Sequence, residues 1–286
     1  MSLAASFEIE YLQYLKPDGT LSGPLPPAVA DAAALLPLFK RMLFVRTFDT
    51  KAIALQRTGK LGTYAACLGH EATHVGIGAS MRSEDVFAPS YREYGAQFER
   101  GVRPREVLLY WGGDERGNDF AGPRGDYPWC VPISTQCLMA SGAALAFKLR
   151  GEQRVAVATC GDGGSSKTDF YAAVNSAGAY SLPLVLCVIN NGWAISVPRK
   201  AQTGAQTLAQ KGIAGGTFCL QVDGNDLIAV LEAMRIATER ARSGQGTSVL
   251  EFVTYRLGDH TTADDARRYR DDAEVKSAWE RDPVTR

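Results

Sequence analysis

Short apolar runs alternate with amphipathic stretches through the second half of the chain. Four runs rich in β-branched residues are short enough to be strands buried on both faces, at 154–160, 184–189, 218–222 and 248–254. Apolar positions at helical spacing occupy 169–180 and 227–242, and a glycine follows the second of these stretches. Alternation of strands with helices predicts an α/β fold with a central parallel sheet and helices on both faces.

The first half of the chain shows helical periodicity instead. Asp31 is a candidate cap for a helix that continues to Arg57. Apolar residues at three- and four-residue spacing predict one apolar stripe on this helix, made of Leu35, Leu36, Leu38, Phe39, Met42 and Leu43. A further helix is predicted over 135–150, whereas 105–128 is rich in Gly, Asp and Arg and has the composition of a loop.

The domain organisation follows from the same pattern. Residues 17–20 have turn composition, and prolines interrupt the chain at 24–27. We therefore expect an N-terminal arm over 1–30 and a single α/β domain over 31–286, with no internal repeat.

Composition excludes several classes of function. The chain has 286 residues and a formal net charge of zero, so a general affinity for nucleic acid or for an anionic membrane is not expected. No apolar run approaches the roughly 20 residues that span a bilayer. The first fifteen residues carry Glu8 and Glu10 and no basic leader, which predicts a cytoplasmic protein.

Cysteines and histidines are few and scattered. The six cysteines form no C-x-x-C pair, so we expect free thiols, with Cys160 and Cys187 packed inside core strands as small hydrophobic groups. Of the three histidines, His70 and His74 share a predicted helix and are expected to pack. His260 instead lies in a polar loop directly after a core strand, where ligands bind in parallel sheets.

Two short polar motifs follow neighbouring strands. Gly161-Asp162-Gly163 comes directly after the first core strand, and Asn190-Asn191 begins after 26 further residues, directly behind the second strand. A right-handed crossover makes the two strands parallel, so both side chains emerge at one edge of the sheet. Glycines let the backbone approach phosphate closely, and a helix N-terminus follows them.

This pair has the chemistry of a magnesium site. Mg²⁺ takes about six oxygen ligands at roughly 2.1 Å and commonly shares them between a carboxylate and the phosphates of a ligand. Asp162, the amide oxygen of Asn191 and one backbone carbonyl would supply the protein's share. Taken singly, Gly-Asp-Gly is also an ordinary turn and Asn-Asn an ordinary helix cap. Their spacing and their place at two strand ends favour the metal site.

These motifs resemble a known family. The spacing of Gly-Asp-Gly and Asn-Asn is similar to that of thiamin-diphosphate enzymes, and the flanking residues resemble the α subunit of the E1 component of 2-oxo acid dehydrogenase complexes. The resemblance covers about 35–283 and is greatest for bacterial pyruvate dehydrogenase E1 α, with the branched-chain enzyme close behind. It implies the thiamin-diphosphate-binding fold.

The resemblance also implies a set of site residues. Asp162, Asn191 and the carbonyl of Trp193 would hold Mg²⁺, and Gly161, Gly163, Gly164 and Ile195 would line the cofactor.

Two upstream segments match the family as well. Tyr91 and Arg92 would contact the diphosphate, although alone this segment also reads as the start of a surface helix. Ile133 would pack on the aminopyrimidine ring and Val131 would contact it through the backbone, although isoleucine also suits an ordinary core.

The loop after the last core strand matches the family's active-site loop. His260 would lie near the reacting carbon and transfer a proton, and Arg256 would reach the diphosphate.

The chain departs from the family pattern at several positions. Lys167-Thr168 stands where many relatives have Glu-Gly, and Asp259 where Pro or His is common. Thr261 occupies the position of a regulatory phosphoserine in animal relatives, and we expect no such control here. The sequence ends at Arg286, before the C-terminal helical segment usual in relatives.

The resemblance implies an activity and partners. With thiamin diphosphate and Mg²⁺, an E1 component decarboxylates a small 2-oxo acid and transfers the acyl group to the lipoyl domain of E2. Pyruvate is the first expectation and 3-methyl-2-oxobutanoate the alternative. No second constellation in the sequence is suited to activating the aminopyrimidine, and the resemblance implies that a β subunit supplies the carboxylate for this step, so we expect an α2β2 assembly.

Other functions remain open on the sequence alone. The chain could serve an acetoin dehydrogenase, or be a non-catalytic subunit that binds Mg-diphosphate for assembly. A nucleotide-binding domain is disfavoured because neither a G-x-x-x-x-G-K-S/T motif nor a strand-linked G-x-G-x-x-G is present.

Overall fold

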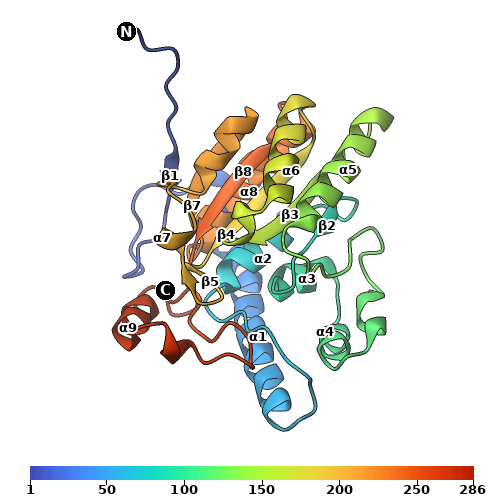
Figure 1. Ribbon diagram of the computed structural model, residues 1–286, viewed down its shortest axis with the longest axis vertical. Coiled ribbons are helices and arrows are strands. Elements are labelled where there is room, and N and C mark those ends of the chain that lie inside the picture. Colours follow the sequence, from blue (N-terminus) through green and yellow to red (C-terminus); the bar gives the residue numbers. More distant parts are fainter.

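A parallel sheet forms the centre of the molecule (Figure 1). The computed structural model describes residues 1–286, apart from the side chain of Ala28. Six strands lie in the order β1-β7-β8-β4-β3-β2, and every neighbouring pair is parallel. The predicted α/β fold with a central parallel sheet is therefore confirmed.

The four strands predicted from apolar runs form the middle of this sheet, and two short strands lie at its edges. A separate two-stranded antiparallel sheet pairs β5 with β6. The bounds are β1 (Glu10–Leu12), β2 (Val86–Ala88), β3 (Ala156–Gly161), β4 (Leu184–Asn190), β5 (Trp193–Ala194), β6 (Val197–Pro198), β7 (Phe218–Asp223) and β8 (Ser248–Val253).

Nine α-helices and five short 3₁₀ segments connect the strands of the described chain. The helices are α1 (Ala32–Arg57), α2 (Glu71–Ala79), α3 (Tyr94–Arg100), α4 (Pro104–Trp111), α5 (Thr135–Arg150), α6 (Thr168–Ala179), α7 (Arg199–Gln202), α8 (Leu227–Arg242) and α9 (Asp272–Trp279). The 3₁₀ segments are η1 (Pro27–Val29), η2 (Glu115–Asn118), η3 (Gly164–Ser166), η4 (Ala209–Gly215) and η5 (Ala266–Arg268).

Helices cover both faces of the sheet. Successive residues of β4 alternate between two cores, as the two-residue period of a strand requires: Leu184 and Leu186 belong to one core, Val185 and Cys187 to the other. Helices α5 and α6 pack on the first core, while α8 with parts of α2 and α3 packs on the second. Cys187, like Cys160, is a buried free thiol in a core strand, as predicted.

The apolar stripe predicted on α1 is wrong in detail. Asp31 does cap the helix, accepting from Ala33 N at 2.8 Å. The buried face, however, is formed by Met42, Val45, Phe48, Asp49 and Ala52. Three members of the predicted stripe are exposed instead, namely Leu36, Phe39 and Leu43.

The structure corrects one further expectation and adds detail to another segment. The loop predicted over 105–128 contains η2 and all of α4 but its first residue, Pro104; α4 is capped by Arg103 and Glu106. Within the predicted arm, β1 pairs with β7 and adds an edge strand to the sheet.

The carboxyl edge of the sheet is where the predicted site lies. Strands β3 and β4 are paired so that Gly161 is opposite Ile189, which brings the residues that follow each strand close together. A third core, built from α1 to α4, packs below this edge. Figure 1 shows α1, α4 and α9 gathered at that end of the molecule. Among the described residues, no helix is long and apolar enough to cross a membrane.

Candidate cofactor site

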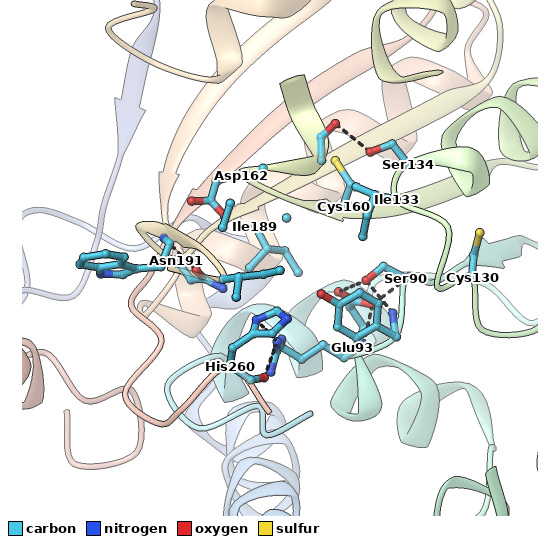
Figure 2. A pocket seen from close by; sticks show the side chains of 18 of the residues that line it. Ser90, Glu93, Cys130, Ile133, Ser134, Cys160, Asp162, Ile189, Asn191 and His260 are labelled. Carbon is cyan, nitrogen blue, oxygen red and sulfur yellow. Dashed lines mark hydrogen bonds between the residues drawn. The ribbon is translucent and has the colours of Figure 1, made fainter. Parts of the chain in front are cut away.

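A cavity of about 280 Å³ lies at the carboxyl edge of the sheet. Residues that follow β2, β3 and β4 line it, together with the start of α5 and the loop after β8. Figure 2 shows Asp162 and Asn191 next to each other on one side of this cavity, with Ser90 and Glu93 across from them. The two polar motifs thus meet at one sheet edge, as the topology predicts.

Asp162 is an almost fully buried carboxylate, with 2 % of its surface exposed. Its Oδ2 accepts one hydrogen bond, from Gln202 Nε2 at 3.2 Å. Burial raises the pKa of this carboxyl, and the bond from Gln202 opposes the rise. A buried carboxylate with so few donors has oxygen lone pairs left for a cation.

The other two predicted metal ligands lie in the loop after β4 and already accept hydrogen bonds. Asn191 Oδ1 accepts from Trp193 N at 3.2 Å, and the Trp193 carbonyl accepts from Arg256 Nη1 at 3.4 Å. Among the described side chains, no three His, Cys, Asp or Glu residues gather into a metal site. A magnesium ion here would therefore take most of its oxygens from phosphate, water, carbonyl and amide groups.

Two cavity residues adopt the left-handed backbone conformation without being glycine. Ser134 has φ 68° at the start of α5, and Ile195 has φ 57°. This region is costly for a β-branched residue such as Ile195, whose side chain is 57 % exposed and gains little from burial. The Ile195 carbonyl accepts from Arg256 Nη2 at 2.9 Å, which holds the loop in this conformation.

The glycines after β3 permit close packing at the cavity wall. A Cβ at Gly163 would lie 2.5 Å from Ala194 Cβ, and one at Gly164 would lie 2.7 Å from Ser134 Oγ. Gly161 has open space around the corresponding position. Side chains are therefore excluded by neighbouring loops at Gly163 and Gly164, and the backbone itself forms the surface there.

Two buried guanidinium groups flank the cavity without carboxylate partners. Arg92 and Arg256 are 7 % and 1 % exposed, and neither forms an ion pair with any described side chain. Arg92 lines the cavity and donates to the Ala66 carbonyl. Arg256 donates to two carbonyls and to Tyr269 Oη at 2.8 Å, and stands behind the lining.

His260 is held between these two arginines. Its Nδ1 lies 3.2 Å from Arg92 Nη2 and 3.4 Å from Arg256 Nη1. Because a guanidinium only donates, Nδ1 accepts and the ring proton sits on Nε2. Burial, with Arg92 and Arg256, lowers the pKa of His260 to about 3, so the imidazole is neutral at physiological pH.

The remaining predicted contacts divide into two groups. Tyr91 and Ile133 line the cavity, and the rings of Tyr91 and His260 meet edge to face at a centroid distance of 6.3 Å. Val131 is 50 % exposed and lies outside the lining.

His70 and His74 also reach the cavity. Both are fully buried, as the packing expectation requires, and their rings stack at 5.4 Å. None of their four ring nitrogens has a hydrogen-bond partner among the described residues. Burial lowers the pKa of His74 to about 3. All three histidines of the chain therefore line one cavity as neutral imidazoles.

Sequence reasoning missed three charged residues around the site. Glu93 lines the cavity and accepts from Ser90 N at 2.9 Å. Glu251 and Lys211 are buried behind the two ligand loops. For Glu251 a signal existed, since a lone glutamate inside an apolar core strand must have buried partners. Lys211 lies in a segment with no strong pattern.

The donor set can be tested against an anionic cofactor with a bound cation. Two unpaired guanidinium groups in a buried setting call for an anion, because an uncompensated buried charge is costly. The nearby undersaturated carboxylate of Asp162 calls for a cation. A magnesium diphosphate satisfies both, so the residues present fit such a group.

The parallel sheet and this charged edge define a class of protein, the α/β enzymes that bind a diphosphate cofactor beyond the carboxyl ends of their strands. Comparison with known families identifies the particular family within this class. The chain belongs to the dehydrogenase E1 component family, whose model matches residues 39–286. It is therefore an oxidoreductase component, and this family works in general with thiamin diphosphate.

Several bacterial proteins are similar over nearly the whole chain. The 3-methyl-2-oxobutanoate dehydrogenase subunit alpha of Mycobacterium tuberculosis strain H37Rv is 41 % identical over 287 residues, 98 % of this chain and 77 % of the relative. The pyruvate dehydrogenase E1 component subunit alpha of Staphylococcus aureus strain N315 is 39 % identical over 281 residues, 98 % and 76 %. The protein of that name from Acholeplasma laidlawii is 39 % identical over 253 residues, 88 % and 73 %.

Proposed function

We propose that this chain is the α subunit of a thiamin-diphosphate-dependent 2-oxo acid dehydrogenase E1 component. The observation that carries the proposal is that one cavity brings together the buried carboxylate of Asp162 and two buried guanidinium groups, neither of which forms an ion pair. Pyruvate is the proposed substrate and 3-methyl-2-oxobutanoate the alternative, since relatives named for each are almost equally similar.

The roles of the binding residues follow from their chemistry. Asp162, Asn191 and the Trp193 carbonyl would hold Mg²⁺, which requires Asn191 Oδ1 and the carbonyl to exchange or share their present hydrogen bonds. Arg92 and Tyr91 would bind diphosphate oxygens, and Arg256 would act from behind by fixing the loop with Trp193 and Ile195. Ile133 would offer an apolar contact to a ring.

When bound, thiamin diphosphate supplies an electron sink for decarboxylation. His260 presents Nε2–H and would first act as a neutral hydrogen-bond donor. An anion bound beside Arg92 and Arg256 would offset the two positive charges that lower the pKa of His260. That change would bring the imidazole closer to the range in which it can transfer a proton.

A β subunit is part of the proposal. Only two carboxylates, Asp162 and Glu93, line the cavity among the described residues, and Ser90 occupies both oxygens of Glu93. With Asp162 assigned to Mg²⁺ and Glu93 bonded to Ser90, neither is left to activate a cofactor ring. We propose that a β subunit supplies this carboxylate, and that the lipoyl domain of E2 accepts the acyl group.

One set of experiments tests the function. The chain is purified with its β partner, loaded with Mg²⁺ and thiamin diphosphate, and assayed for 2-oxo-acid-dependent reduction of a dye acceptor. Pyruvate and 3-methyl-2-oxobutanoate are compared by kcat/KM, with acetoin as a third substrate. Turnover of acetoin but neither 2-oxo acid would overturn the proposal. Turnover of none, with cofactor bound, would indicate a subunit that binds the cofactor only for assembly.

A further inference from the structure

Lys211 is a buried lysine on η4, behind the turn that follows Asp162. Only 6 % of the surface of Lys211 is exposed. Its Nζ donates to the carbonyl and the hydroxyl of Ser165, both at 2.9 Å, and to Ser166 Oγ at 3.3 Å. All three N–H donors of the ammonium are therefore directed at the single turn η3.

No carboxylate forms an ion pair with Lys211 among the described side chains. Each of its acceptors is a neutral oxygen, and burial lowers the pKa of the ammonium. A buried cation without a counter-ion is costly in free energy. An anion bound across the turn would compensate this charge.

The turn connects Lys211 to the cavity. Ser165 Oγ accepts from Lys211 and donates to the carbonyl of Asp162 at 2.7 Å. Gly164 precedes Ser165 and Lys167 follows Ser166 in the chain, and both Gly164 and Lys167 line the cavity. Movement of the ammonium would therefore shift the backbone that carries Asp162.

Segment η4, which carries Lys211, is also connected to the loop after β4 that carries Asn191. Glu251 on β8 accepts from Leu208 N at 2.7 Å and Ala209 N at 3.0 Å, at the start of η4. Its second oxygen accepts from Asn190 Nδ2 at 2.7 Å. Through η4, the buried pair Glu251 and Lys211 links the loop of Asn191 to the loop of Asp162.

We propose that Lys211 is a positioning residue for the cofactor diphosphate, fixing the turn of Asp162 and adding positive charge behind it. The inference rests on the proposed function, because it assumes that a diphosphate binds at this cavity. Lys211 differs from Arg92 because its ammonium lies behind the turn and would act on the diphosphate through Ser165 and through the electric field of its charge.

The test measures binding, so it does not depend on turnover. Isothermal titration gives Kd of the purified α chain, with its β partner present, for Mg-thiamin diphosphate and for Mg-pyrophosphate. K211M removes the charge at similar side-chain length, K211R restores a charge, and K51M neutralises an exposed lysine on α1 as the matched control. We expect K211M to weaken both ligands about tenfold or more, K211R to recover part of the loss, and K51M to match wild type.

The dependence of ligand affinity on ionic strength distinguishes an electrostatic role of Lys211 from a role in stabilising the turn alone. Binding to wild type should weaken as ionic strength rises, and K211M should show a smaller dependence because one cationic group is gone. A purely structural role would instead lower the thermal midpoint of K211M and leave the salt dependence unchanged. If K211M does not fold, K211Q replaces it as the neutral variant.

The outcomes distinguish the two proposals. Wild-type affinity in the folded neutral variant, or an unchanged salt dependence, would overturn the role of Lys211 while leaving the cofactor site intact. Failure of the wild-type assembly to bind either ligand would overturn the proposed function itself.

Discussion

Asp162 shows at the level of one residue how a binding group can cost stability. Its carboxylate is buried with a single side-chain donor, and burial raises its pKa. Ionising it inside the protein is unfavourable, so the group destabilises the free chain. The same lack of donors leaves its oxygens available to a cation.

The substitution D162N should therefore separate binding from stability. We expect the ligand-free thermal midpoint to stay equal or rise, while affinity for Mg-thiamin diphosphate falls about a hundredfold or more, the upper end of what altered metal-site residues cost. Differential scanning fluorimetry and titration calorimetry measure the two quantities. Wild-type affinity in D162N would remove Asp162 from the ligand set.

The buried imidazoles predict a pH dependence of stability. The pKa of His74 is lowered to about 3 in the folded chain and is about 6.5 when unfolded, so between these values the unfolded state binds more protons. The contribution of His74 is fully present above about pH 6.5 and is lost as pH falls toward about 3.

H74Q should accordingly flatten the stability profile. Urea unfolding between about pH 4 and pH 6.5 should show a slope lower than wild type by up to about 1.4 kcal/mol per pH unit. H260Q offers a comparison in which the same effect arises beside Arg92 and Arg256. Equal slopes in wild type and H74Q would show that His74 is already protonated in the folded chain.

How far the sequence predicted the site depends on the range of each interaction. Asp162 and Asn191 were predictable because each follows a strand directly, and the parallel pairing of these two strands brings both residues to one edge of the sheet. The neutral state of His260 was not predictable, because it depends on Arg92, which is 168 positions away. Lys211 was missed for the same reason, since its partners lie about 46 positions before it.

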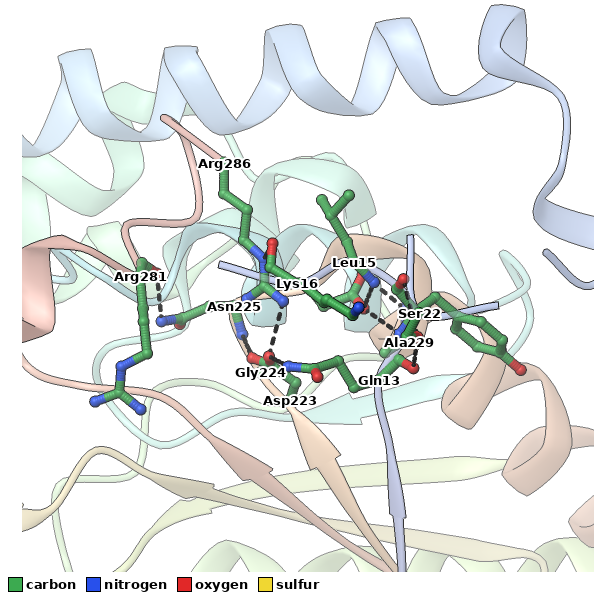
Figure 3. Close-up of polar contacts among 12 residues, drawn as sticks. Gln13, Leu15, Lys16, Ser22, Asp223, Gly224, Asn225, Ala229, Arg281 and Arg286 are labelled. Carbon is green, nitrogen blue, oxygen red and sulfur yellow. Dashed lines mark hydrogen bonds and ion pairs between the residues drawn. The ribbon is translucent and has the colours of Figure 1, made fainter. Parts of the chain in front are cut away.

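At the level of elements, the turn after β7 joins distant parts of the chain (Figure 3). Asp226 caps α8 by accepting from Ile228 N and Ala229 N, and its other oxygen accepts from Tyr14 N and Leu15 N. One carboxylate thus satisfies four backbone donors from two segments. It fixes α8 and the N-terminal residues to the same edge of the sheet.

Loss of this carboxylate should be expensive. D226A leaves the cap empty and buried N–H groups unpaired, so we expect the free energy of unfolding to fall by about 2–4 kcal/mol. The matched variant D226N keeps one acceptor and should lose less. Urea titrations at constant m-value give both numbers. A D226A chain as stable as D226N would show that the four bonds contribute little.

The elements themselves were predicted unevenly. Helices α5 and α8 begin and end where the pattern placed them, because burial against a sheet imposes a clear period. Strands β1 and β2 are three residues long, too short to show alternation. Helix α4 was read as loop because glycines and charges just beyond it dominate the composition of that stretch.

At the level of the whole molecule, the cavity rim has exposed apolar side chains. Ile133 and Ile195 are 43 % and 57 % exposed, and Val131, two positions before Ile133 in the chain, is 50 % exposed. The left-handed backbone at Ile195 holds one of these side chains outward at a cost in strain. Such a surface around a charged cavity agrees with a site completed by another subunit.

The purified α chain should therefore be inactive by itself. We expect no dye reduction with any 2-oxo acid until the β subunit is added, because the described carboxylates of the lining are Asp162, which we assign to Mg²⁺, and Glu93, which accepts two hydrogen bonds from Ser90. Turnover is measured as β is titrated and should saturate at equal amounts of the two chains. Measurable decarboxylation by the α chain alone would contradict the shared site.

The mutual repulsion of Arg92, Arg256 and any proton on His260 has a consequence for the life of the protein in the cell. An anion that binds among these groups stabilises the folded state, and above its Kd this stabilisation grows with the logarithm of its free concentration. Proteolysis acts mainly on opened molecules, so occupied chains are degraded more slowly. The cellular supply of thiamin diphosphate would then set how many copies survive as well as how many are active.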